Sequence, residues 1–196
     1  MSLQEAIARW PLVTALVFEG ALIPLALGLA LWAGVTPWAD LEVTGAAVAL
    51  GAAGTLPLLL GLTALARLDL PAFRQLEAMV RDVLVRLFTD VRPGGVLLVA
   101  ALAGLGEELL FRGVIQGWLA EHLPAVAAIA VTSLLFGVAH ALNGLYFVIA
   151  TLVGLYLGVL YHVTGNLFIV VFIHALYDWI VIHVYLRQAR AASTPD

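Results

Sequence analysis

The sequence predicts an all-α fold: a polytopic membrane helical bundle of about six transmembrane helices, with one amphipathic helix at the cytoplasmic interface. Of its 196 residues, 63% are hydrophobic and only 11% are charged, whereas about a quarter of a typical soluble domain is charged. Apolar runs of roughly 20 residues, the length that crosses a bilayer, recur along the chain. A further segment repeats apolar residues at helical spacing and carries charged residues on its other face.

The composition excludes several classes of site and partner. The chain has no cysteine, which removes disulfides, thiolate metal ligands and a cysteine nucleophile. It also has no lysine and no basic stripe dense enough to bind phosphates, so we expect no nucleic-acid partner.

The chain is expected to form one integral membrane domain over residues 1–196. Its first apolar run is too long for a signal-peptide core and has no basic lead, so we interpret it as a retained transmembrane helix. The expected spans are 12–35 and 43–66, which are the N-terminal helices (12–66), then 95–120, 125–143, 145–163 and 167–186, between a polar lead (1–11) and a tail from Arg187 to Asp196.

Residues 70–89 are predicted to form the amphipathic helix, with Pro71 at its start. Its apolar face consists of Leu70, Phe73, Leu76, Val80, Val83, Leu84 and Leu87. Its charged face includes Arg74 and two expected ion pairs four residues apart, Glu77–Arg81 and Asp82–Arg86. Two placements fit the sequence: in the membrane interface, or as a connector packed on the bundle.

Six spans place both ends of the chain on one side of the membrane, and the arginines agree with this topology. The arginines that fall on that side are Arg9, Arg67, Arg74, Arg81, Arg86, Arg92, Arg187 and Arg190. The remaining one, Arg112, lies inside a span. Because positive charge is enriched in cytoplasmic loops, we expect a multi-pass protein of the cell membrane with both termini in the cytoplasm.

The stretch from Gly106 to Gly113 puts two carboxylates and an arginine into an otherwise apolar run. A charge at bilayer depth costs about 2.5–3.5 kcal/mol on insertion scales, so it indicates a functional site. Glu108 and Arg112 are four residues apart, in the orientation that favours an ion pair. Glu107 is turned about 100° away and has no partner within its own helix. We interpret Glu108–Arg112 as a brace and Glu107 as free to act.

Few other polar groups lie within the expected spans: Glu19, His140, His174 and Asp178. A carboxylate with imidazoles is suited to activating water, since one group takes a proton while another stabilises an oxyanion. The same set could bind zinc through His140, His174 and Glu107 and leave one position for water. The His-Glu-x-x-His signature of many zinc proteases is absent.

Three motifs resemble those of the CPBP family of intramembrane proteases, which groups the type II CaaX prenyl proteases with bacterial bacteriocin-processing and immunity proteins. They are Glu107-Glu108-x-x-x-Arg112, Phe136-x-x-x-His140 and His174-x-x-x-Asp178, in the family's order and in separate spans. The resemblance covers about residues 100–182 and implies a catalytic core at about 93–187. Residues 1–90 carry none of it.

The resemblance implies a role for each motif residue. Glu107 and His140 would activate the attacking water, His174 and Asp178 would form an oxyanion site or orient the water, and Glu108, Arg112 and Phe136 would support the site. Many family members have asparagine in place of Asp178. An ionised aspartate cannot donate a hydrogen bond to an oxyanion, so it would orient His174 or bind metal, whereas a protonated one could still donate. Zinc and a metal-free glutamate–histidine mechanism both fit the resemblance.

Helix rise per residue sets a condition on this site. It places Glu107 about 17 Å and His174 about 18 Å below the cytoplasmic ends of their helices, but His140 only about 5 Å deep. The groups meet only if the turn at Asn143-Gly144 is sunk in the bundle or the third span starts above it. We predict that His140 reaches Glu107. Glu19 either lines the cavity or bonds to a neighbouring helix.

The sequence therefore predicts an intramembrane endopeptidase that hydrolyses a peptide bond of a membrane-associated or lipidated substrate. The alternative is a non-enzymatic immunity or regulatory protein on the same scaffold. A haem protein is disfavoured by the carboxylates beside the histidines, and a proton-coupled transporter by the lack of an inverted repeat. The expected partners are the lipid bilayer and a peptide or membrane-protein substrate. The sequence names neither the substrate nor the oligomeric state.

Overall fold

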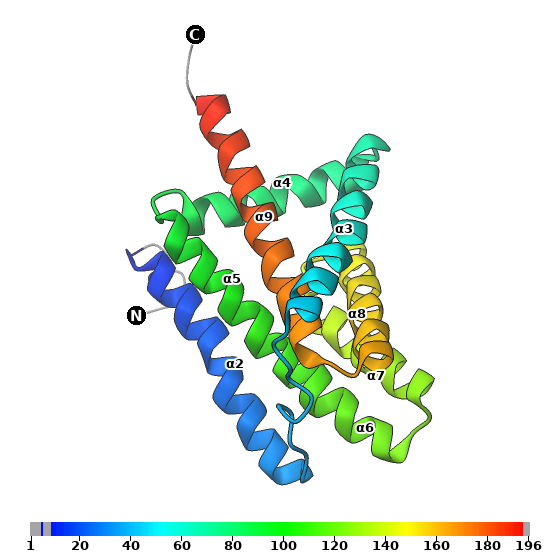
Figure 1. Cartoon of the computed structure of the whole chain (residues 1–196). Helices are drawn as coiled ribbons and strands as arrows, with labels where there is room; N and C mark the ends of the chain where they lie inside the picture. The colour runs from blue at the N-terminus through cyan, green and yellow to red at the C-terminus, as the bar shows by residue number, and fades with distance from the viewer. Residues whose placement is uncertain (1–4, 6–8, 194–196) are drawn as a thin grey trace.

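The computed structural model describes residue 5 and residues 9–193, and all regular structure in that part of the chain is helical (Figure 1). Its elements in order are α2 (Pro11–Ala33), α3 (Gly45–Arg67), α4 (Pro71–Phe88), α5 (Pro93–Glu108), the π-helix η1 (Leu109–Gln116), α6 (Gly117–His122), α7 (Ala125–Ala139), α8 (Gly144–Thr164) and α9 (Leu167–Ser193). The prediction of an all-α polytopic bundle is confirmed.

Five helical segments are long and apolar enough to cross a membrane: Pro11–Ala33, Gly45–Arg67, Pro93–His122, Gly144–Thr164 and Leu167–Ala191. The remaining apolar helix, α7, has 15 residues. At 1.5 Å per residue it rises only about 22 Å, less than the ~30 Å hydrocarbon core. Six full-length spans were expected. The structure differs at the span before His140, whose helix is shorter than the hydrocarbon core is thick.

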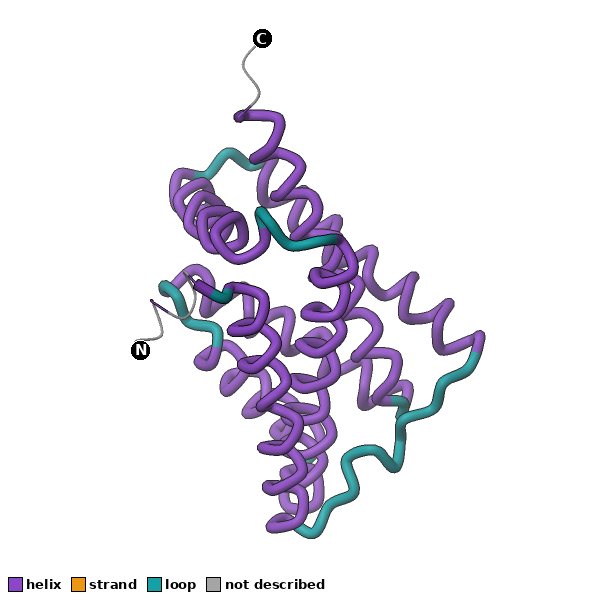
Figure 2. The backbone as a smooth tube through the Cα atoms, turned by 90° about the vertical axis from the view of Figure 1, so that its left-hand side faces the viewer, coloured by secondary structure: helices purple, strands orange, loops and turns teal. Residues whose placement is uncertain are grey.

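The centre of the bundle is formed by α5 and α9, with α2 alongside α5 and α3 against α9 (Figure 1). Helices α7 and α8 form a hairpin. Figure 2 views the bundle from another side and shows its helices joined by loops. The contact between α5 and α9 is close because of Gly104: a Cβ there would lie 2.8 Å from the carbonyl oxygen of Val171 and 2.9 Å from the backbone nitrogen of Ala175. This contact sets the carboxylates at the end of α5 against His174.

The amphipathic helix α4 runs across the bundle at the end where α5 begins (Figure 1). It buries Phe73, Leu76 and Phe88 against the other helices and leaves its charged face exposed. Asp82 and Arg86 form the expected ion pair at 2.9 Å. One face of this helix therefore packs on the bundle, and its position in the membrane interface stays a prediction.

The two ends of the bundle are tied differently. At one end Asn166 exchanges two hydrogen bonds with the backbone of Glu42, and the backbone N–H of Leu167 donates to the Asp40 carbonyl at 2.8 Å. At the other end Arg190 donates to the Thr89 carbonyl at 3.1 Å, which joins α9 to the turn after α4.

The predicted terminal segments agree only in part with the structure. Helix α9 continues to Ser193, so the tail expected from Arg187 is helical over much of its length. Residues 1–4, 6–8 and 194–196 of the predicted lead and tail lie outside the described part of the chain. The single-domain prediction over 1–196 stays a prediction.

Candidate active site

The two carboxylates stand where the central helix changes its winding. Helix α5 ends at Glu108, and the π-helix Leu109–Gln116 follows, in which the N–H of Gly117 bonds to the carbonyl of Arg112, five residues back. Such a wide turn is rare and is found mostly at functional sites. Glu107 and Glu108 are 8% and 0% exposed, so both carboxylates need partners inside the bundle.

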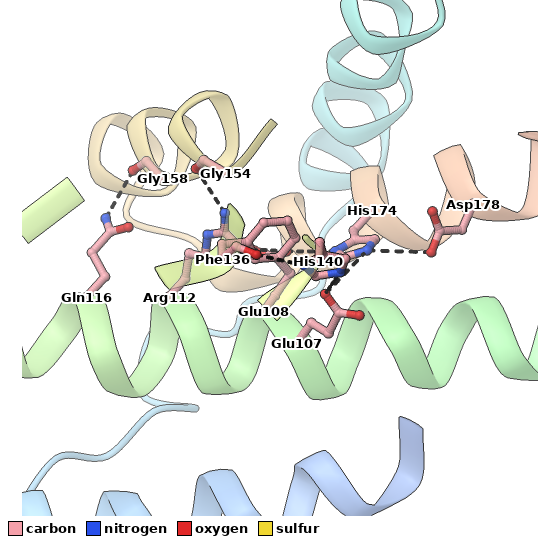
Figure 3. A network of polar contacts seen from close by, with 10 residues as sticks. All are labelled: Glu107, Glu108, Arg112, Gln116, Phe136, His140, Gly154, Gly158, His174 and Asp178. Carbon is pink, nitrogen blue, oxygen red and sulfur yellow. Dashed lines mark hydrogen bonds and ion pairs between the residues drawn. The ribbon is translucent and has the colours of Figure 1, made fainter. Parts of the chain in front are cut away.

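Glu108 and Arg112 form a fully buried ion pair, with Nη1 of Arg112 donating to Oε1 of Glu108 at 2.9 Å. Arg112 also donates through Nη2 to the carbonyl of Gly154 at 2.9 Å, and Gln116 donates to the carbonyl of Gly158 at 3.0 Å. Figure 3 shows these side chains leaving one face of the helix toward α8. The small Gly154 and Gly158 let α8 approach closely enough for its carbonyls to accept these bonds.

Phe136 packs between the charged groups and contributes an apolar part of the cavity wall. Its ring stacks on His140 with centroids 4.3 Å apart, and the guanidinium of Arg112 lies 4.7 Å from the ring centroid. Phe111 meets it edge-on at 5.0 Å. The stacking fixes the imidazole plane of His140 and shields the buried guanidinium, so Phe136 lies where a supporting residue is expected.

His174 is held through both ring nitrogens. Its Nδ1 lies 2.7 Å from Oε1 of Glu108, which also accepts a hydrogen bond from Arg112. A carboxylate paired with an arginine can only accept, so Nδ1 of His174 is the donor. This assignment orients Nε2 toward the cavity, where it lies 3.5 Å from Oδ2 of Asp178 and 4.0 Å from Oε2 of Glu107. Two flanking carboxylates favour a protonated Nε2. Glu108 therefore positions His174 as well as pairing with Arg112.

His140 meets Glu107 directly, with 3.2 Å between Nε2 and Oε2. Its Nδ1 lies 2.8 Å from the carbonyl of Phe136, which can only accept, so Nδ1 carries a proton. A neutral His140 then turns the lone pair of Nε2 toward a carboxylate oxygen. Two acceptors this close hold either one shared proton or a water molecule that donates to both, which is the arrangement that general-base catalysis requires.

The predicted convergence of Glu107, His140, His174 and Asp178 is found in the structure (Figure 3). The sequence had placed His140 too near the membrane surface to meet Glu107 and His174. The short helix α7 accounts for their contact, because it ends at Ala139 with His140 as its C-cap. The turn before α8 thus lies beside the catalytic groups proposed below, although its Leu142 is 55% exposed. Both His140 and Leu142 line the interior cavity described next.

A cavity of about 700 Å³ lies beside these groups. Glu107, His140, His174 and Asp178 all line it, and most of the remaining wall is apolar and comes from every long helix of the bundle, including α4. The wall also contains Glu19, Tyr146 and Tyr177. Tyr146 interacts electrostatically with both Glu107 and Asp178. Neither tyrosine stands out in the sequence as a site residue, because a tyrosine in a span usually marks the membrane interface.

The expectation that Glu107, His140 and His174 bind zinc stays a prediction. Within the described part of the chain, no group of three or more His, Cys, Asp or Glu side chains has the spacing of a metal site. The nitrogens of His174 contact carboxylates, and His140 contacts Glu107 at hydrogen-bonding distance.

Residues 90–180 of the chain match the family model described as type II CAAX prenyl endopeptidase Rce1-like. The match contains all three motifs and confirms the family resemblance drawn from them. Helices α2, α3 and α4 lie outside it. No curated protein and no solved structure matches the chain.

Proposed function

We propose that this membrane-helix bundle, whose residues 90–180 match a family of CAAX prenyl endopeptidases, is an intramembrane endopeptidase of the CPBP type. The observation that carries the proposal is the contact between Glu107 and His140, 3.2 Å apart, beside His174 on the wall of one cavity. A general base, a second proton carrier and a hydrogen-bond donor are thus within reach of one water molecule.

The reaction begins with a water molecule that donates hydrogen bonds to Oε2 of Glu107 and Nε2 of His140. Glu107 takes a proton from this water while the water oxygen attacks the carbonyl carbon of the scissile bond. The electron pair of the carbonyl double bond moves to the carbonyl oxygen. The tetrahedral intermediate collapses when the carbon–nitrogen bond breaks. The leaving amine takes the proton held by Glu107 and His140, so a carboxylic acid and an amine are released.

His174 is the donor for the developing oxyanion. Its Nε2 faces the cavity between Glu107 and Asp178, and its Nδ1 is held by Glu108. Asp178 lies 3.5 Å from Nε2 and stabilises the imidazolium, which explains how an aspartate can serve at a position where many family members have asparagine. Preorganised donors of this kind contribute about 10²–10³ in rate.

The cavity favours a substrate with an extended apolar part. Its wall is mostly aliphatic and aromatic, and its volume of about 700 Å³ lies in the usual range for pockets that take small-molecule-sized groups. A lipidated peptide or a membrane-spanning segment fits this chemistry. The arginines at the α4 end of the bundle favour a cytoplasmic orientation for that end, with both termini of the chain on the same side.

The test is cleavage of lipidated and transmembrane peptides by the protein in liposomes, with products identified by mass spectrometry. We expect Glu107→Gln to lower the rate at least 100-fold while the thermal unfolding midpoint is retained. Glu121→Gln is the matched control, because Glu121 is exposed on α6 away from the cavity. Full activity of Glu107→Gln would overturn the proposal.

The zinc alternative for Glu107, His140 and His174 is tested separately. The glutamate–histidine mechanism needs no metal, so dialysis against a strong chelator should leave the cleavage rate unchanged. Loss of activity that added zinc restores would favour the metal-assisted mechanism, in which these residues would rearrange to bind the ion.

The second candidate function, a non-enzymatic immunity or regulatory protein, is favoured by the same buried network, which would also fix helix packing without any reaction. In that case a cellular phenotype of the protein would survive Glu107→Gln. The proposed protease activity requires the phenotype to be lost.

A further inference from the structure

We propose that Glu19 recognises a positively charged side chain of the substrate next to the scissile bond. Glu19 lies in the middle of α2, outside the segment that matches the endopeptidase family. It nevertheless lines the same cavity as Glu107 and Asp178. The inference rests on the proposed function and adds a specificity residue to that site.

The packing of α2 on α5 places Glu19 beside the catalytic carboxylate. A Cβ on Gly106 would lie 3.0 Å from the carbonyl oxygen of Glu19 and 3.1 Å from Cβ of Leu22. Only glycine allows this approach, and the next residue along α5 is Glu107. Glu19 interacts electrostatically with Glu107, Asp178, His174 and His140, so its carboxyl group faces the centre of the site.

The carboxyl group of Glu19 contains a buried oxygen without a hydrogen-bond partner among the described residues. Its Oε2 is buried and makes no hydrogen bond with any residue that the structure describes. A buried polar atom without a partner costs about 1–3 kcal/mol. The neighbouring backbone cannot relieve this cost, because the N–H groups around Glu19 are used within α2. A ligand in the cavity can.

The charges around the site leave Glu19 without a counter-ion. With His140 neutral, as in the proposed mechanism, Arg112 and a protonated His174 supply two positive charges against the three carboxylates Glu107, Glu108 and Asp178. Glu19 adds a further carboxyl group, and Glu77 of α4 adds another at the edge of the cavity. No arginine is among the described residues that line the cavity.

This balance selects the substrate. A lysine or arginine side chain would pair with Glu19 and reduce the excess of negative charge in a low-dielectric cavity. A free terminal carboxylate at the same place would meet several carboxyl groups and no cation, so it is disfavoured. The expected substrate is therefore an apolar or lipidated peptide with one basic residue near the cleaved bond.

The first experiment compares two versions of a peptide that the wild-type protein cleaves, with lysine or norleucine beside the scissile bond. A charge-assisted hydrogen bond corresponds to about tenfold or more in kcat/KM. We expect wild type to prefer the lysine peptide by that factor and Glu19→Gln to lose the preference. Glu19→Asp, which keeps the charge on a shorter side chain, should keep part of it, and Glu121→Gln should keep all of it.

The second experiment measures binding without cleavage. A fluorescent, palmitoylated leucine-rich peptide with one lysine is titrated into Glu107→Gln and into Glu107→Gln/Glu19→Gln, both in nanodiscs and both checked by thermal unfolding. We expect the dissociation constant to rise about tenfold in the double variant, and not to change for the norleucine peptide.

The outcomes separate the two proposals. Cleavage by wild type with the same lysine preference in Glu19→Gln, or equal binding to both variants, would overturn the role of Glu19 and leave the protease proposal standing. Absence of cleavage by wild type together with Glu19-dependent binding would overturn the protease proposal and keep the recognition role.

Discussion

Oε1 of Glu108 accepts a hydrogen bond from Nδ1 of His174 at 2.7 Å, and 66 residues of sequence separate the two. The same oxygen accepts from Arg112 at 2.9 Å. One carboxylate therefore joins the buried arginine, which holds α8, to the imidazole that faces the cavity. In the proposed reaction Glu108 positions His174, and in the bundle it pairs with the buried Arg112; experiment can separate these two roles.

Glu108→Gln should lower kcat about 10–100-fold with a small change in KM. Glutamine keeps an acceptor oxygen for His174 but removes the charge that stabilises its imidazolium, and partners of this kind typically contribute that factor. Steady-state kinetics with a cleaved peptide measures it. A fall in thermal stability with unchanged kcat would show that Glu108 has only a structural role.

Arg112→Met should destabilise the protein by about 3–5 kcal/mol, because it leaves the fully buried Glu108 without its counter-ion. Unfolding by denaturant in detergent measures this loss. Arg86→Met removes the equivalent partner from the exposed pair with Asp82 and should change stability by less than about 1 kcal/mol. In the double variant Glu108→Leu/Arg112→Met part of the stability should return, and a further loss there would contradict the argument.

Asp178→Asn should retain activity within about tenfold, whereas Asp178→Leu should lose at least 100-fold. Oδ2 of Asp178 lies 3.5 Å from Nε2 of His174. The amide oxygen of asparagine can keep this contact, but leucine has no acceptor that could. Peptide cleavage by the two variants decides this. Equal losses in both would mean that the charge of Asp178, and not its hydrogen-bonding oxygen, is essential.

Gly104→Ala should destabilise the bundle by about 1–3 kcal/mol, because the added methyl group would press against the backbone of α9 at Val171 and Ala175. Gly94→Ala is the matched control, since a Cβ there meets nothing within 4 Å. The control should be neutral or stabilising, as alanine favours helix over glycine. Thermal unfolding of both variants gives the comparison, and similar midpoints would exclude a tight contact at Gly104.

Much of the fold could be predicted from the sequence because hydropathy and charge act locally. The apolar runs predicted the long helices to within a few residues, except that α9 continues seven residues beyond its predicted end, and Pro71 marked the start of α4. The i,i+4 pair Glu108–Arg112 followed from helix geometry alone. The shortness of α7 was missed, because the sequence around His140 continues the apolar pattern beyond the point where the helix ends.

The site could be predicted only in part, because its contacts cross between helices. The motifs identified Glu107, His140, His174 and Asp178, but the bond from Glu108 to His174 depends on how α5 packs on α9. Glu19 and Tyr146 each stand alone in their helices, with no neighbour at helical spacing that would indicate a shared site. Only the cavity brings them to the catalytic groups.

The π-helix after Glu108 makes this segment sensitive to its length. Deleting one residue between Leu109 and Gln116 would convert the i→i+5 bonds to ordinary i→i+4 bonds, because the wide turn holds more residues than an α-helical turn. The helix on both sides of the deletion would keep its facing, but the side chains within the segment would shift, and Arg112 would lose its present position opposite the carbonyl of Gly154. The wide turn thus accommodates an additional residue in the central helix without rotating its two halves against each other.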